Sequence, residues 1–140
     1  MSERAPRDLR ERVFEFSCAT VTFCRELSKE TGVVRQIAWQ LADAATSAGA
    51  NLEEAKSAYS RRDFAYKNSV SLKEMREALY WLRVIMRCAL APPASVQPLM
   101  QEADELTAML TAGMRRLRPV GALIVIALAV TAAVFWWRTP

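Results

Sequence analysis

Residues 60–85 read SRRDFAYKNSVSLKEMREALYWLRVI, a stretch rich in charged and aromatic residues that no glycine or proline interrupts. Ser60 followed by Asp63 resembles a capping box, in which the serine hydroxyl and the acid satisfy first-turn N–H groups. Ala91-Pro92-Pro93 would stop a helix, because proline lacks the N–H that the helix needs. The sequence therefore predicts one long helix from about Ser60 to about Leu90.

At 100° per residue, this helix separates its side chains onto different faces. The face expected to pack in the core contains Phe64, Ser71, Met75, Ala78, Leu79, Leu82, Ile85 and Met86. An arc of roughly 80° on the other side, which we call the basic arc, contains Arg62, Lys73, Arg76, Arg83 and Arg87, with Tyr80 among them. Glu74, Glu77 and Trp81 occupy a third flank. One side of the helix can therefore build a fold while another offers charge.

Three more helices with apolar stripes are expected, from about Arg7 to Lys29, from about Val33 to Ala58, and from about Ser95 onward. Their inward residues are Leu9, Val13, Phe16, Thr20, Phe23 and Leu27 in the first, Val34, Ile37, Ala38, Leu41, Ala45, Ala48 and Leu52 in the second, and Val96, Leu99, Ala103, Leu106, Leu110 and Leu117 in the last. The many alanines of the second would allow close helix packing. Four amphipathic helices with short connections predict an all-α, antiparallel up-down four-helix bundle over residues 1–118.

The basic arc has two interpretations. It is a solvated helix face supported by pairs such as Lys73 with Glu77 at i, i+4, or it is a stripe that binds phosphates. The net charge of +4 is a mild basic excess and agrees with either. No recognised nucleic-acid motif points to readout of bases.

Catalytic and metal chemistry has little support in this sequence. Histidine is absent, which removes the usual general base and the usual zinc ligand. The cysteines Cys18, Cys24 and Cys88 form no CxxC pair, and no secretory signal precedes them, so we expect a reducing cytosolic setting with Cys18 and Cys88 as small apolar residues. Either Cys24 or Ser47 with Lys67 could be imagined as nucleophile and base, yet no oxyanion motif or cofactor loop accompanies them. We expect no enzyme, no catalytic residue and no cofactor.

A polar line runs beside the core face of the second helix, through Asp43, Ser47, Asn51 and Glu54. Carboxylate metal sites in four-helix bundles also use Glu-x-x-His, so the missing histidine favours structural or interface hydrogen bonding over a metal. Lys67 lies at the edge of the core face of the 60–90 helix, and we expect it to meet one of these acids.

The last segment, residues 119–140, differs in composition from the rest. Val120 to Trp137 is 18 residues without a charge, about 27 Å long as a helix and close to the thickness of a bilayer core. Arg115, Arg116 and Arg118 precede it, which favours a membrane helix with a cytoplasmic N-terminal side. The residues expected to anchor it are Val120, Leu123, Ile126, Val130, Trp136 and Trp137. The alternative is a fifth helix buried in an oligomer.

Residues 47–82, SAGANLEEAKSAYSRRDFAYKNSVSLKEMREALYWL, resemble a known family. The pattern consists of Ser47, Asn51, Glu54, Ala55, Ser60, Asp63, Phe64, Lys67, Lys73, Glu74, Glu77, Tyr80, Trp81 and Leu82. It is similar to that of the four-helix bundle proteins called 23S rRNA intervening-sequence proteins, or the S23 family. In organisation the resemblance extends over about residues 8–118, and it does not include the apolar tail.

The resemblance implies a bundle that assembles as a ring, commonly a pentamer, in a family without established enzymatic activity. We expect Ser47, Asn51, Glu54, Asp63, Phe64, Lys67, Tyr80 and Trp81 to have structural or interface roles. Relatives are encoded in insertions of ribosomal RNA genes, and a similar bundle is the accessory protein of diversity-generating retroelements, where a basic surface engages a reverse transcriptase and RNA. We therefore expect a non-enzymatic oligomeric adaptor with a basic surface for RNA, DNA or a nucleic-acid enzyme. The alternative is an oligomeric scaffold or effector held at the inner membrane by its tail, with the bundle in the cytoplasm.

Overall fold

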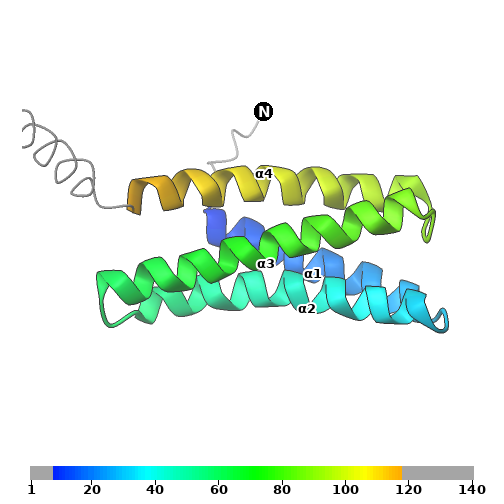
Figure 1. The fold of residues 1–140 in the computed structure, drawn as a ribbon, viewed down its shortest axis with the longest axis horizontal. Helices are drawn as coiled ribbons and strands as arrows, with labels where there is room; N and C mark the ends of the chain where they lie inside the picture. The colour runs from blue at the N-terminus through cyan, green and yellow to red at the C-terminus, as the bar shows by residue number, and fades with distance from the viewer. Residues whose placement is uncertain (1–7, 118–140) are drawn as a thin grey trace, which may run out of the picture.

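The chain forms a bundle of four α-helices in the computed structural model, which describes residues 8–117 (Figure 1). The helices are α1 (Leu9–Leu27), α2 (Val33–Glu54), α3 (Arg61–Arg87) and α4 (Pro93–Leu117), with a short 3₁₀ turn at Ala55–Ser57 and no strand in the described range. Consecutive helices pack against each other, and α4 also contacts α1, which closes the bundle. The predicted all-α four-helix architecture is therefore confirmed.

The predicted tail and its anchor residues lie outside the described residues. None of the helices within residues 8–117 combines the length and the apolar character that a membrane span requires.

The start of α3 follows the predicted cap in part. Ser60 Oγ accepts a hydrogen bond from the N–H of Asp63 at 3.0 Å. The Asp63 carboxylate accepts from the N–H of Tyr59 at 3.3 Å, one residue earlier than a capping box would place it. Both side chains therefore satisfy backbone donors where α3 begins, as the sequence predicts.

The other end of α3 comes earlier than predicted, at Arg87 instead of about Leu90. Ala89 adopts a left-handed conformation with φ of 51°. The N–H of Leu90 donates to the carbonyl of Ile85 at 3.0 Å, and the N–H of Ala89 donates to the carbonyl of Met86 at 3.2 Å. These two bonds form a Schellman motif, which ends the helix before the prolines can. Pro93 instead begins α4, two residues before the predicted Ser95, because proline suits a first helical turn.

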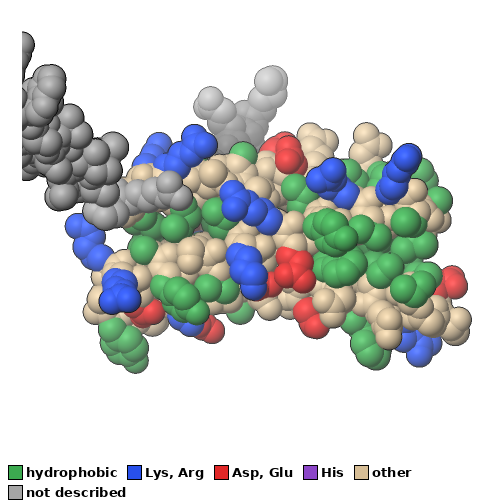
Figure 2. All heavy atoms as spheres, in the orientation of Figure 1, with side chains coloured by type: hydrophobic (Ala, Val, Ile, Leu, Met, Phe, Trp, Pro, Cys, Tyr) green, Lys and Arg blue, Asp and Glu red, His purple; other side chains and the backbone are tan. Residues whose placement is uncertain are grey.

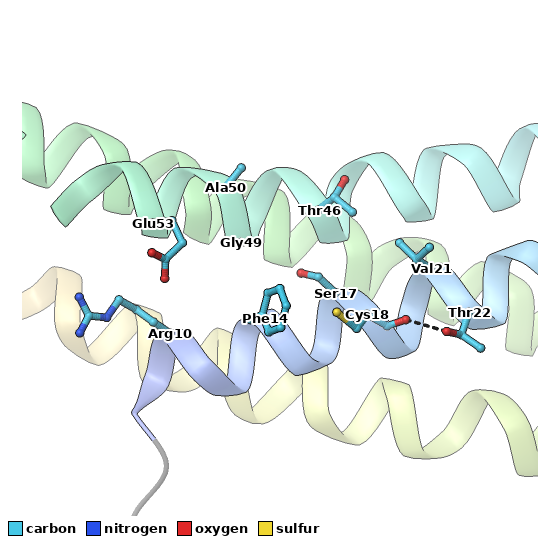
Figure 3. A pocket seen from close by; sticks show the side chains of 10 residues that line it. All are labelled: Arg10, Phe14, Ser17, Cys18, Val21, Thr22, Thr46, Gly49, Ala50 and Glu53. Carbon is cyan, nitrogen blue, oxygen red and sulfur yellow. Dashed lines mark hydrogen bonds between the residues drawn. The ribbon is translucent and has the colours of Figure 1, made fainter. Parts of the chain in front are cut away.

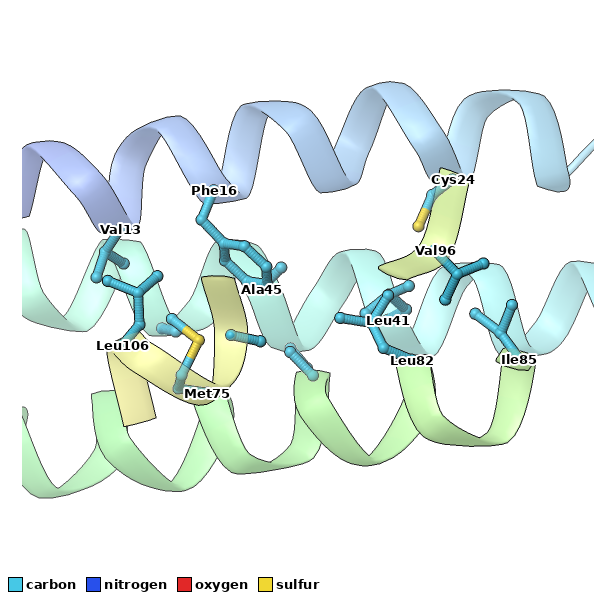
Figure 4. Packing of buried hydrophobic residues seen from close by; sticks show 14 of the residues in the cluster. Val13, Phe16, Cys24, Leu41, Ala45, Met75, Leu82, Ile85, Val96 and Leu106 are labelled. Carbon is cyan, nitrogen blue, oxygen red and sulfur yellow. The ribbon is translucent and has the colours of Figure 1, made fainter. Parts of the chain in front are cut away.

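The core lies along the bundle axis between all four helices (Figure 4). The residues of the predicted stripes are buried or partly buried against it, and among the largest fully buried side chains are Val13, Leu41, Met75, Leu82, Ile85, Val96 and Leu106. Phe64 was predicted to be core, and this is wrong, because its side chain is 39% exposed. It lies in the first turn of α3, where it shares a shallow surface hollow with Ala58 and Leu117 instead of packing between helices.

Small residues let α1, α2 and α3 approach closely, as the alanines of α2 predict. Ser17 Oγ of α1 donates to the carbonyl of Ala45 at 2.8 Å, and Ser71 Oγ of α3 donates to the carbonyl of Ala48 at 2.7 Å. A hydroxyl-to-carbonyl bond between helices requires the two backbones to lie close together. Side chains larger than alanine on α2 would hold them further apart.

Candidate nucleic-acid interface

All five cations of the basic arc are exposed on α3. In the face shown in Figure 2, Lys and Arg side chains gather on both sides of the boundary between α3 and α4, with hydrophobic side chains among them. Within the described residues, Lys73 is the one member of the arc at ion-pair distance from a carboxylate, 3.5 Å from Glu74. The predicted pair of Lys73 with Glu77 does not form, because Glu77 instead accepts a hydrogen bond from the indole of Trp81 at 3.4 Å.

Two of the arc cations join a third cation in a hollow between α3 and α4, which we call the tail-side hollow. It measures about 540 Å³ and is lined by Ser69, Leu72, Lys73, Arg76, Thr111, Met114 and Arg115. Arg76 donates to the hydroxyl of Thr111 at 3.4 Å, a long bond that leaves most of its guanidinium free. No acidic side chain lines this hollow. Three positive charges therefore line it, and the one carboxylate at ion-pair distance from them in the described residues is Glu74, which pairs with Lys73 from outside the lining.

Arg115 is the member of the candidate site that sequence reasoning missed. The sequence placed it with the basic residues ahead of the apolar tail, whereas α4 packs beside α3 so that Arg115 joins Lys73 and Arg76. The signal that could have found it is its neighbour in the sequence. Met114 is half-buried against the core, so Arg115, one residue later, lies beside the packed face of α4.

A second hollow, which we call the aromatic hollow, lies further along α3. It measures about 570 Å³ and is lined by Tyr80, Arg83, Val84, Met86, Arg87, Cys88 and Met100. Tyr80 is 56% exposed, and its ring meets that of Trp81 edge to face with centroids 5.0 Å apart. The two hollows account for four of the five arc cations, whereas Arg62, in the first turn of α3, lines neither.

An apolar groove between α1 and α2 forms a separate surface (Figure 3). Phe14 and Val21 of α1 are 55% and 44% exposed there, above a floor that includes Gly49 and Ala50 of α2. Cys18 also lines this groove and is exposed. Periodicity alone did not predict the groove, because Phe14, Cys18 and Val21 lie outside the inward stripe of α1.

The cysteines differ from expectation. Cys18 and Cys88, predicted to be small apolar residues, are exposed, while Cys24 is the buried one. Burial raises the pKa of the Cys24 thiol to about 12, which keeps it protonated at neutral pH. Cys24 lies near the end of α1 beside Val96 (Figure 4), whereas Lys67 pairs with Glu54 at the opposite end of the bundle. The imagined pair of Cys24 and Lys67 is therefore not brought together.

The described residues contain no group of three or more Cys, Asp or Glu side chains that could hold a metal ion. On α2, Asn51 donates to the carbonyl of Ser47 at 2.9 Å, a bond within its own helix. Both residues are half-buried.

Residues 8–112 match the family model of the 23S rRNA-intervening sequence protein. This chain belongs to that family. The crystal structure of an S23 ribosomal protein family member of unknown function from Bacteroides thetaiotaomicron VPI-5482 is similar, with a TM-score of 0.70 and 28% identity. That match covers 76% of this chain and 98% of the other. No curated protein matches this chain.

In this intervening-sequence protein, several residues of the predicted family pattern perform structural work. Lys67 of α3 forms an ion pair with Glu54 of α2, as we expected from the sequence, and the hydrogen bond to Glu54 raises the pKa of Lys67. Asp63 caps the start of α3, and Trp81 is held by Glu77. The family pattern thus includes ties between neighbouring helices and within α3.

Proposed function

We propose that this intervening-sequence family member is a non-enzymatic, oligomeric helical-bundle adaptor whose basic surface engages nucleic acid or a nucleic-acid enzyme. The observation that carries the proposal is the group of exposed cations on α3 and α4, five of them in two hollows without an acidic side chain in the lining. Cations without nearby carboxylates attract phosphate more strongly than cations that are already paired.

The partner that fits best is RNA or DNA, because exposed Lys and Arg contact phosphates without reading sequence. The resemblance to retroelement accessory proteins adds a reverse transcriptase as a candidate partner. A basic surface would meet such an enzyme at an acidic patch or through an RNA that both proteins hold.

Self-association, as a pentamer or another ring, belongs to the same proposal. The apolar groove of Phe14 and Val21 supports it, because burying exposed apolar side chains against a second copy is favourable. An oligomer would also multiply the basic surface and so strengthen binding to a long polyanion.

Electrophoretic shift assays at 50 and 200 mM salt test the proposal. Binding should weaken steeply with salt, because phosphate contacts release counterions. The variant Arg83→Gln/Arg87→Gln should bind more weakly. Its control is Arg25→Gln/Lys29→Gln, which removes the same charge from cations that lie near Glu26 on α1. Absence of any shift at 50 mM salt would exclude nucleic acid as the partner.

The non-enzymatic part of the proposal rests on the state of the reactive side chains. The Cys24 thiol is buried with a raised pKa, and Lys67 is tied to Glu54 with its pKa also raised. The Cys24 thiol is therefore not ionised as a nucleophile needs, and the protonated amine of Lys67 is not available as the base.

A second candidate is a membrane-anchored oligomeric scaffold or effector, with its bundle in the cytoplasm and its tail in the inner membrane. The charge-free run from Val120 to Trp137 favours it. Fractionation of cells that express either the full chain or a chain ending at Arg118 tests it. The full chain should sediment with membranes and the shorter chain should not, and both chains in the supernatant would exclude the anchor.

A further inference from the structure

The two basic hollows follow the same boundary between α3 and α4. Lys73 and Arg76 line the tail-side hollow, and Arg83 and Arg87 line the aromatic hollow two turns further along α3. From Lys73 to Arg87 the helix rises about 21 Å. Positive charge therefore extends over about half the length of α3, which suits a long, flexible polyanion better than a single small anion.

Tyr80 stands between these two groups of cations in the sequence of α3. Its ring is 56% exposed, and the edge-to-face contact with Trp81 restricts its motion. Trp81 is itself half-buried and donates to Glu77, so the ring of Tyr80 rests on a fixed neighbour. A held aromatic side chain beside Arg83 and Arg87 offers a flat face at the point where a charged backbone would pass.

Cations that follow a backbone, combined with an exposed aromatic ring on which a base can stack, are the features of proteins that bind single strands. A duplex would contact the cations but not stack on Tyr80, because its bases are stacked on each other and present only their edges. We propose that the boundary between α3 and α4 binds single-stranded nucleic acid, with Tyr80 as the stacking platform. Lys73, Arg76, Arg115, Arg83 and Arg87 hold the phosphates. This inference rests on the proposed function and specifies the form of its ligand.

The direction of the stripe argues against an anionic lipid surface as the occupant. The chain continues toward the apolar tail from the end of α4 near Arg115, while Arg87 lies near the start of α4, at the opposite end of the bundle. A bilayer at the tail would reach Arg115 and leave Arg83 and Arg87 unused. A single strand can follow the whole stripe.

Fluorescence anisotropy of the full chain in detergent tests the inference. The probes are a labelled 20-nucleotide polyuridine and a labelled 20-base-pair RNA duplex, both at 50 mM salt. Tyr80→Ala should weaken binding of the single strand by roughly 5- to 150-fold, the value of one stacked base, and change duplex binding little. Tyr80→Phe keeps the aromatic face and should restore most of that loss. Tyr59→Ala, which removes a fully exposed tyrosine that lines neither hollow, is the matched control.

The results separate this inference from the proposed function. Preferential binding of the single strand with the loss at Tyr80→Ala supports both. A second result would be equal affinity for both probes, with no effect of Tyr80→Ala but weaker binding by Arg83→Gln/Arg87→Gln. It overturns the stacking site at Tyr80 but still supports the basic surface of the proposed function. Failure of both probes to bind overturns this inference and removes RNA from the proposed function, which then depends on a nucleic-acid enzyme as the partner.

Discussion

Arg12 of α1 holds Glu102 of α4 in a two-point ion pair, with Nε donating to Oε1 at 2.9 Å and Nη2 donating to Oε2 at 2.8 Å. The same Nη2 also donates to Glu105 at 2.8 Å. This cluster ties the first helix to the last. Two-point geometry, with an Arg12 side chain that is only 24% exposed, is the arrangement in which such a pair contributes measurably.

Replacing Arg12 with Gln should lower the melting temperature at pH 7 by roughly 3–6 °C, the shift that about 1 kcal/mol produces in a domain of this size. Arg12 holds the pKa of Glu105 below its usual value of 4.5. The pair therefore stabilises the fold above that value and loses its effect as the pH falls through the lower, folded-state pKa. The melting temperatures of the wild type and of Arg12→Gln, measured from pH 7 to pH 3, should become equal in acid. A constant difference across that range would contradict this account.

Replacing Ala89 with Gly should stabilise the protein by about 0.5–1 kcal/mol. Ala89 occupies a left-handed position that costs an L-residue about 1–2 kcal/mol, and part of this gain is offset by the greater freedom of glycine in the unfolded chain. Urea denaturation measures the change. The matched control is Ala94→Gly, in the first turn of α4, where the conformation is helical and glycine should destabilise.

Gly49 and Gly113 should respond in opposite ways to alanine. A Cβ at Gly49 would lie 3.0 Å from Ser17 Oγ, which is fixed by its bond to Ala45, whereas nothing lies within 4 Å of the same atom at Gly113. Gly113→Ala should therefore gain about 0.5–1 kcal/mol of helix propensity, and Gly49→Ala should lose that gain to the clash. Chemical denaturation compares the two, and equal stabilisation would show that α1 and α2 can separate freely.

Thr20→Val should stabilise the protein by about 1 kcal/mol. The Thr20 hydroxyl is fully buried and has no hydrogen-bond partner within residues 8–117, so valine of similar shape removes the cost of its desolvation. The control is Ser71→Ala, which removes a hydroxyl that is bonded to Ala48 and should destabilise. Thermal melts distinguish the two signs.

Arg76→Gln should reduce the salt dependence of nucleic-acid binding. If Arg76 contacts one phosphate of a single strand, its loss should make the slope of log affinity against log salt shallower by about 0.7. Arg25→Gln, on α1, should leave the slope unchanged. Anisotropy titrations at four salt concentrations give both slopes, and an unchanged slope for Arg76→Gln would remove that residue from the interface.

The sequence alone determined the four helices, most of their buried stripes and the basic arc, whereas for Lys67 it predicted an acidic partner on the second helix without saying which one. Each depends on the 3.6-residue period of one helix or on capping chemistry near its ends, which neighbouring residues in the chain specify. The ends themselves were less predictable. The Schellman bonds around Ala89 stopped α3 three residues before the expected Leu90, because hydrogen bonding at the turn acted before the prolines could.

Only the tertiary structure decided which surfaces the helices form together. Arg115 joins Lys73 and Arg76 because α4 packs beside α3 at a particular register, and Phe14 with Val21 borders a groove because Gly49 lets α2 approach α1. Phe64 has the period of a core residue but lies in the first turn of α3, where its side chain stays 39% exposed. The period of a helix sets the direction of each side chain, whereas contacts between helices set what that side chain meets.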